Sequence, residues 1–141
     1  MGNVDIIEGS MFAGCSSLES VVFPDSVKEI HCGGEMFASS GVKRVYIGSG
    51  LEVLDQEDGV MFDYSDVEEV VVSENNKTFD SRDNCNAIIE TATNTLIATC
   101  KNSFIPDGVE VIGSGAILDN FSSVTIPLSV KVIKKKAFLY S

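Results

Sequence analysis

The sequence contains no tryptophan, one histidine and only three prolines among its 141 residues. It also has no long hydrophobic run. The longest uncharged apolar stretches, such as 87–89 and 116–118, fall far short of the roughly 20 residues that a membrane-spanning helix needs. No basic stretch followed by an apolar one opens the chain, as an export signal would. We therefore predict no membrane insertion.

Positive charge is scarce. Ten lysines and arginines stand against 21 acidic residues, which gives a net charge of −11. Such a surface repels the phosphates of nucleic acids and of anionic lipids, so both are disfavoured as partners. Twelve of the acids lie between residues 51 and 90, which predicts a solvated acidic face. Lys131, Lys134, Lys135 and Lys136 form a small basic cluster without a nearby acid, and we expect them to protect an edge strand from pairing.

Catalytic and metal-binding patterns are missing as well. The one histidine, His31, follows the apolar Ile30, and no G-x-S-x-G motif is present, so a Ser-His-Asp triad is disfavoured and His31 is expected to be a surface residue. The four cysteines lack the C-x-x-C spacing of zinc sites. The side chains of Asp80, Asp83 and Asn86 are of the kind that binds calcium, but their spacing does not fit the calcium-binding loop of an EF-hand. We predict neither an enzyme nor a cofactor.

The residues that are present indicate a folded domain, because 44% are hydrophobic and 22% are charged. Met-Phe pairs recur every 25 residues, at 11–12, 36–37 and 61–62. The segment 11–30 reads as an aromatic residue, a polar turn, a short β-rich run, a proline and Val-x-x-Ile, and 121–138 repeats this order. A unit this short buries its apolar face only by stacking on the next unit, which predicts a β-rich solenoid.

Each unit is expected to carry two short strands, and we expect one sheet to contain 20–23, 44–47, 69–72, 103–105 and 123–126. The period breaks between residues 73 and 103, where 87–91 and 95–99 predict an inserted β-hairpin. Segment 4–12 matches 130–138 as the second half of a repeat. We therefore expect residues 1–141 to form a single domain that is a fragment of a longer repeat protein.

Cys85 and Cys100 flank the two ends of this hairpin, so they are expected to lie close together. If the protein is exported, a disulfide between them is compatible with that placement. Two unpaired thiols are the alternative, which we favour because the sequence does not fix their geometry. Cys15 is expected to be a buried free thiol.

The segments FAGCSSLESVVFPDSVKEI and NNKTFDSRDNCNAIIETATNTLIATCKNSFIPDGVEVIG resemble the BspA-like leucine-rich repeat proteins, a family of bacterial surfaces that is abundant in Bacteroidetes and also expanded in some parasitic protists. The resemblance runs from Val4 to Phe138 and implies a right-handed superhelix of short strands with few helical turns. It also implies a non-catalytic scaffold for adhesion or for binding proteins or glycans of a host or matrix. An extracellular or cell-surface location follows by analogy, because an export signal would lie elsewhere in the full-length protein.

The outward side of the first strand in each unit is the candidate site. If Val21 and Phe23 point inward, alternation turns Val22 outward, and the same register exposes Tyr46, Val71, Phe104 and Thr125 as one strip. We expect the binding residues to be Arg44, Tyr46, Glu69, Val71 and Phe104. The alternatives left open are that such residues merely suit strands, and that the module is a structural spacer with no ligand.

Overall fold

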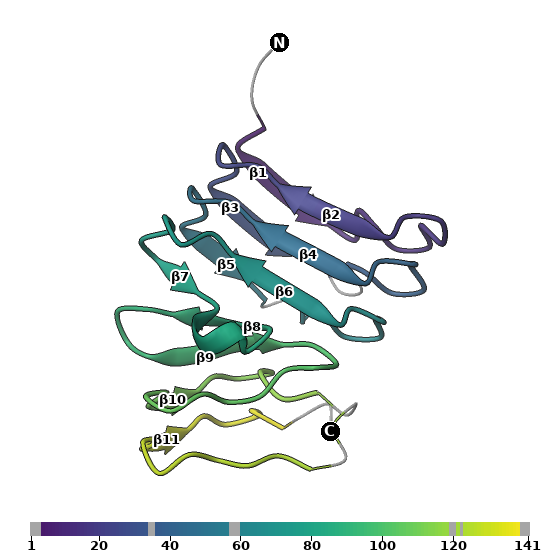
Figure 1. Ribbon diagram of the computed structural model, residues 1–141. Helices are drawn as coiled ribbons and strands as arrows, with labels where there is room; N and C mark the ends of the chain where they lie inside the picture. The colour runs from purple at the N-terminus through teal and green to yellow at the C-terminus, as the bar shows by residue number, and fades with distance from the viewer. Residues whose placement is uncertain (1–3, 34–35, 57–59, 119–120, 122, 139–141) are drawn as a thin grey trace.

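The computed structural model describes residues 4–33, 36–56, 60–118, 121 and 123–138. It is a β-solenoid of about five turns, and Figure 1 shows these turns stacked from the N-terminal end to the C-terminal end with strands on two opposite faces. Helical structure in the described residues is limited to a 3₁₀ turn, η1 (Arg82–Asn84). No helix among these residues has the length and hydrophobicity required to cross a membrane.

One face of the stack is a parallel sheet of three strands, β2 (Ser20–Phe23), β4 (Arg44–Ile47) and β6 (Glu69–Val72). These strands have the predicted bounds. Each contains an apolar residue at its second and fourth positions, and these residues are buried while the first and third are more exposed. Period-two alternation and β-branched residues thus fix which side of this sheet covers the core.

The opposite face begins with a second parallel sheet, formed by β1 (Ile6–Gly9), β3 (Glu29–Cys32) and β5 (Val53–Asp55). A five-stranded sheet follows in the order β11-β10-β9-β8-β7. Its strands are β7 (Phe79–Asp80), β8 (Ala87–Glu90), β9 (Thr95–Thr99), β10 (Val111–Ile112) and β11 (Val132–Ile133).

The predicted hairpin is confirmed, because β8 and β9 pair in antiparallel fashion. Its role in the stack differs from that of a simple insertion. β9 also pairs in parallel with β10, and the carbonyl oxygen of Asn94 accepts the backbone N–H groups of Glu110 and Val111, at 2.9 and 3.3 Å. The second arm of the hairpin therefore serves as the rear strand of a solenoid turn.

The prediction that 103–105 and 123–126 are strands of the first sheet is wrong, because neither segment forms a strand in the structure. The local hydrogen bonds give the reason. The N–H of Phe104 donates to the carbonyl oxygen of Cys85 at 3.1 Å, and the hydroxyl group of Ser103 contacts the carbonyl oxygen of Asn86. Segment 103–105 is thus held by the chain that enters the hairpin, and not by β6.

The recurring Met-Phe pairs build the centre of the stack. The ring of Phe37 stacks on that of Phe12 at a centroid distance of 5.3 Å and on that of Phe62 at 5.8 Å. Phe37 and Phe62 are almost completely buried, as are Met36 and Met61. The 25-residue period thus places equivalent aromatic rings above one another, which is why it appears in the sequence.

The second copy of the repeat has Gly48-Ser49-Gly50 where the first has Pro24-Asp25-Ser26. A Cβ atom at Gly50 would overlap the carbonyl oxygen of Asp25 in the turn above. The carboxylate of Asp25 in turn accepts the N–H of Ser49 at 2.8 Å. Two turns approach each other closely at this point, so the sequence departs from the repeat pattern there.

Candidate binding surface

Three of the predicted outward-facing residues lie side by side on the first sheet. The register pairs Val22 with Tyr46 and Tyr46 with Val71 across the three parallel strands. Val22 is 66% exposed and Val71 is 37% exposed, while Tyr46 is half-buried between them. We call these three residues the apolar strip. They line a shallow depression together with Pro24, Ile47 and Ser73.

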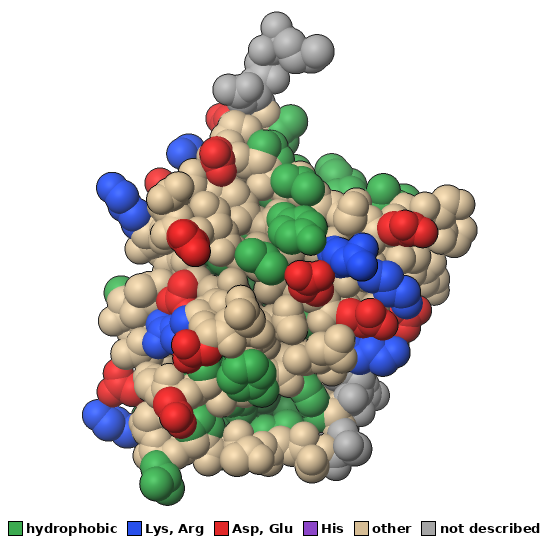
Figure 2. All heavy atoms as spheres, in the orientation of Figure 1, with side chains coloured by type: hydrophobic (Ala, Val, Ile, Leu, Met, Phe, Trp, Pro, Cys, Tyr) green, Lys and Arg blue, Asp and Glu red, His purple; other side chains and the backbone are tan. Residues whose placement is uncertain are grey.

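A charged pair borders the apolar strip. Arg44 Nε lies 3.3 Å from Glu69 Oε2, and the register pairs these two residues directly between β4 and β6. Both side chains are about half exposed, so the pair contributes little to stability and stays accessible to a partner. Figure 2 shows hydrophobic side chains gathered over β2, β4 and β6, with charges of both signs along one margin of that face.

The structure therefore brings together four of the five predicted binding residues, Arg44, Tyr46, Glu69 and Val71. Phe104 lies elsewhere. It is 50% exposed and lines a separate hollow of about 300 Å³ with Ile105, Ile117, Phe121, Val124, Thr125 and other residues. We call this cavity the Phe104 hollow. It lies between segments 103–105 and 123–126, which fail to pair as strands.

A polar groove adjoins the apolar strip on the side of the insertion. Its lining includes Arg44, Glu69 and Val71 from the sheet, and Ser81, Asn84, Asn86 and Asn102 from the segments around the hairpin. Figure 1 shows η1 in front of β8, just below β6. The predicted strip is thus divided in two, because residues 81–86 occupy the position where a fourth strand was expected.

His31 forms contacts that the sequence interpretation did not identify. Its Nδ1 lies 3.0 Å from Asp55 Oδ2 and its Nε2 lies 2.9 Å from Glu29 Oε1. The hydrogen bonds with Asp55 and with Glu29 raise the pKa of His31 above its ordinary value. The signal available was the alignment of the first two copies of the repeat, because Asp55 follows His31 by the same 24 residues that separate Phe23 from Ile47, and β3 and β5 pair His31 with Asp55 directly. No group of three or more side chains suited to hold a metal ion occurs in the described part of the chain.

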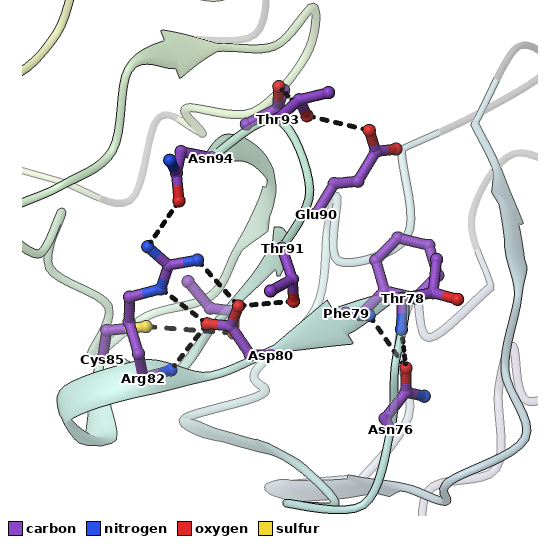
Figure 3. A network of polar contacts seen from close by, with 12 residues as sticks. Asn76, Thr78, Phe79, Asp80, Arg82, Cys85, Glu90, Thr91, Thr93 and Asn94 are labelled. Atoms are coloured by element: carbon purple, nitrogen blue, oxygen red, sulfur yellow. Dashed lines mark hydrogen bonds and ion pairs between the residues drawn. The ribbon is translucent and has the colours of Figure 1, made fainter.

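A second polar network holds the hairpin against the solenoid (Figure 3). Arg82 donates from Nε and Nη2 to the two carboxylate oxygens of Asp80, both at 2.8 Å, and from Nη1 to Asn94 Oδ1 at 2.8 Å. Asn94 then donates to Glu110 Oε2 at 2.8 Å. Burial raises the pKa of Asp80, but hydrogen bonds from Arg82 and Thr91 outweigh it, so the pKa is lowered overall. This network is structural, since its members bond to one another.

The four cysteines are unpaired in the structure. Cys85 and Cys100 are fully buried and point to neighbouring carbonyl oxygens, with Sγ at 3.9 Å from Ala87 O and at 3.2 Å from Asn86 O, respectively. Burial raises the pKa of Cys85 to about 11 and also raises that of Cys100. Unpaired thiols stay the favoured prediction for Cys85 and Cys100, and a disulfide between them stays the alternative for an exported protein. Cys15, expected to be buried, is half-buried.

Comparisons with known proteins agree with this architecture. The model of the "BspA type leucine rich repeat region" matches six copies, over residues 2–99 and 75–141. A leucine-rich repeat protein from Eubacterium ventriosum has a TM-score of 0.76 at 21% identity, over 95% of this chain and 36% of that one. The pneumococcal vaccine antigen PcpA has a TM-score of 0.53 at 16% identity, over 92% of this chain and 39% of PcpA.

At these identities the two structures show a shared fold alone, and the chain spans little more than a third of the length of either. No curated protein matches it. The family model, by contrast, covers nearly every residue of the chain in its two overlapping matches. The chain belongs to the BspA-type leucine-rich repeat family.

Proposed function

We propose that this chain is a non-catalytic binding module of an extracellular or cell-surface repeat protein, and that it engages a protein or a glycan of a host or its matrix. The surface that makes the contact is the apolar strip, Val22, Tyr46 and Val71, with Arg44 and Glu69 at its margin. The observation that carries this proposal is the register of β2, β4 and β6, which sets these residues next to one another at positions that alternate with the buried ones.

The composition of the apolar strip supports this role. Interfaces are enriched in tyrosine and arginine, and a half-buried tyrosine on a rigid strand loses little conformational freedom when a partner covers it. Tyr46 has an exposed valine on each side in the sheet. Arg44 and Glu69 offer a planar donor and an acceptor for polar groups of the partner. A central aromatic anchor of this kind commonly contributes about 2 kcal/mol or more to binding.

The non-enzymatic assignment rests on the family, since leucine-rich repeat families are generally not enzymes. The described side chains agree with it. His31 is engaged by two carboxylates, and burial raises the pKa of Cys32, Cys85 and Cys100, which disfavours the reactive thiolate form of each.

A structural spacer is the alternative. In that case the exposed residues of β2, β4 and β6 reflect strand propensity alone, and no partner covers them. The two functions differ in one measurable property, which is whether the isolated chain binds anything through this face.

The test is a binding screen of the purified chain against immobilised extracellular-matrix proteins and a glycan array. Any positive signal is then measured with Arg44→Glu, which reverses one charge at the margin of the apolar strip. We expect this substitution to weaken binding roughly tenfold, because it removes the guanidinium group offered to the partner and sets a second carboxylate beside Glu69.

The matched control is Val53→Ser, which removes an exposed apolar side chain from the opposite sheet. It should leave binding unchanged. Equal losses from Arg44→Glu and Val53→Ser would contradict the assignment of the surface, and a chain that binds nothing in the screen would favour the spacer.

A further inference from the structure

The polar groove follows one edge of β6, in the middle of the stack. β6 pairs with β4 on one side, and no described strand pairs with its other edge. Residues 81–86 stand there instead, and the groove between them and β6 has a volume of about 320 Å³. A second hollow of about 280 Å³ continues along the same edge and shares Val71, Ser81 and Asn84 with the first. The two hollows therefore form one continuous channel beside β6.

The main chain of β6 points a free donor and a free acceptor at this groove. The N–H of Glu69 donates to the carbonyl oxygen of Lys43 at 3.0 Å, so the peptide groups of Glu69 face β4. Alternate residues of a strand face opposite sides, so those of Val70 and Val72 face the groove. The N–H of Val72 donates to Ser81 Oγ at 2.9 Å. Among the described residues, none is hydrogen-bonded to the N–H or the carbonyl oxygen of Val70.

The surroundings of Val70 limit what can bond to it. Val70 is buried and lines the polar groove, and buried peptide groups are almost always paired. The carbonyl oxygen of Val67 accepts the N–H of Lys101 at 3.0 Å, so the free edge is closed on both sides of Val70. An added peptide strand needs several consecutive free groups, and this edge offers those of one residue. A small group that both donates and accepts, such as a hydroxyl, fits instead.

Three amide side chains are also available in the polar groove. Asn84, Asn86 and Asn102 line it, and their amide groups have no hydrogen bond to a described residue. Each amide supplies two N–H donors and an acceptor oxygen. Asn84 and Asn86 both have a φ of 55°, a left-handed conformation that asparagine adopts more readily than most residues. The groove thus offers several donors and acceptors within a small space.

The wall that carries these amides is held in place by main-chain hydrogen bonds. The N–H of Cys85 donates to the carbonyl oxygen of Arg82, and the carbonyl oxygen of Cys85 accepts the N–H of Phe104, both at 3.1 Å. Arg82 is fixed in turn by its ion pair with Asp80. A ligand that enters the groove therefore orders little of the protein, which lowers the entropic cost of binding.

The charges of the groove favour a neutral ligand. Two basic and two acidic residues line the polar groove, Lys43, Arg44, Glu68 and Glu69. The second hollow adds Glu74 and Asp83. The lysine cluster at the end of the chain lies outside the groove, and Lys131 Nζ lies 3.0 Å from Glu110 Oε1, which corrects the expectation that this cluster has no acid nearby. The groove has no surplus of positive charge to attract a sulfate, a phosphate or a carboxylate.

Val71 joins the polar groove to the apolar strip. It lines the polar groove, the second hollow and the depression of the apolar strip, and it lies beside Tyr46 in the sheet. A ligand in the groove therefore contacts polar groups on one side and apolar surface on the other. Sugar rings have this division, because hydroxyl groups surround a ring whose faces carry C–H groups.

We propose that the polar groove binds a neutral oligosaccharide. Its hydroxyl groups bond to the amides of Asn84, Asn86 and Asn102 and to the free peptide groups of Val70, and its C–H faces lie on Val71 and Tyr46. This inference rests on the proposed function and narrows the partner to a glycan without charged groups.

The first experiment is a glycan array that presents neutral oligosaccharides beside sulfated and sialylated forms of the same cores. We expect the chain to bind neutral members and to lose binding when a charged group is added. Asn84→Asp and Asn102→Asp should each weaken binding of the best neutral oligosaccharide roughly tenfold, because a carboxylate of the same size cannot donate. Asn75→Asp, on an exposed loop outside the groove, is the matched control and should change nothing.

The second experiment is an NMR titration with that oligosaccharide. The N–H signal of Val70 should shift, whereas that of Val53 on the opposite sheet should not. Binding of sulfated or sialylated glycans alone, binding of no glycan, or an unmoved Val70 signal would overturn the inference. A matrix protein stripped of its glycans that loses affinity with Tyr46→Ser, but not with Asn84→Asp, would overturn the inference and leave the proposed function standing.

Discussion

Tyr46 on β4 lies directly opposite Val71 on β6, the parallel strand of the next turn of the solenoid. Its neighbours on the same strand, Val45 and Ile47, point into the core and are almost completely buried. A single strand therefore divides its residues between stability and contact with solvent, which makes the two roles separable by mutation.

Val45→Ser and Tyr46→Ser should differ sharply in their effect on stability. Val45 is fully buried, so its replacement leaves a cavity with a polar group and is expected to lower the free energy of unfolding by about 2 kcal/mol or more. Tyr46→Ser should cost about 1 kcal/mol or less, as is usual for surface positions. Chemical denaturation measures both, and the opposite order would mean that the strand register is shifted by one residue.

His31 should contribute stability in a pH-dependent way. Since hydrogen bonds with Asp55 and Glu29 raise its pKa in the folded state, the protonated ring stabilises the fold at pH values below its unfolded pKa of about 6.5. This contribution is lost as the pH rises through the raised value. The difference in stability between the original chain and His31→Gln should therefore be larger at mildly acidic than at mildly basic pH. An imidazole pKa at or below 6.5 in an NMR titration would contradict this account.

The Arg82 network should matter more for stability than an exposed ion pair. Arg82→Met removes three hydrogen bonds at 2.8 Å from a partly buried site, and we expect a loss of about 1–2 kcal/mol. Because the pKa of Asp80 is lowered overall in the folded state, the contribution of the Arg82–Asp80 pair to stability is present at neutral pH and is lost as the pH falls through the acidic range. Lys77→Met, at an exposed position, serves as control and should cost almost nothing. Equal costs for the two variants would refute the role of the network.

The cysteines should react with a thiol reagent at different rates in the native protein. Cys32, Cys85 and Cys100 are buried. Burial is the main reason that the pKa of Cys32 is raised to about 12 and that of Cys85 to about 11. Cys15 is half-buried, so it should be modified first. Mass spectrometry of the labelled protein identifies the sites. Labelling of Cys85 as fast as that of Cys15 would show that the hairpin opens readily.

The sequence allowed β2, β4 and β6 to be predicted with their correct bounds, because the alternation of apolar residues is a local pattern and recurs in each copy of the repeat. It could not place Phe104. Phe104 follows the apolar alternation equally well, but its N–H group donates to the carbonyl oxygen of Cys85. Cys85 lies in the inserted segment, which the alternation does not place. The Arg82 network was missed for a similar reason, since its members come from β7, from η1, from the turn of the hairpin and from the residue before β10. His31 and Asp55 could have been paired by aligning the first two copies of the repeat, in which Phe23 corresponds to Ile47.

The measurement that tests the central claim most directly is the affinity of two single variants, Tyr46→Ser and Phe104→Ser, for the matrix protein or glycan that is positive in the binding screen. Tyr46 belongs to the apolar strip, whereas Phe104 lines a separate hollow. We expect Tyr46→Ser to weaken binding at least roughly tenfold, with its circular dichroism unchanged, and Phe104→Ser to bind as the original chain does. Unchanged binding by Tyr46→Ser, or a loss confined to Phe104→Ser, would contradict the assignment of function to the face formed by β2, β4 and β6.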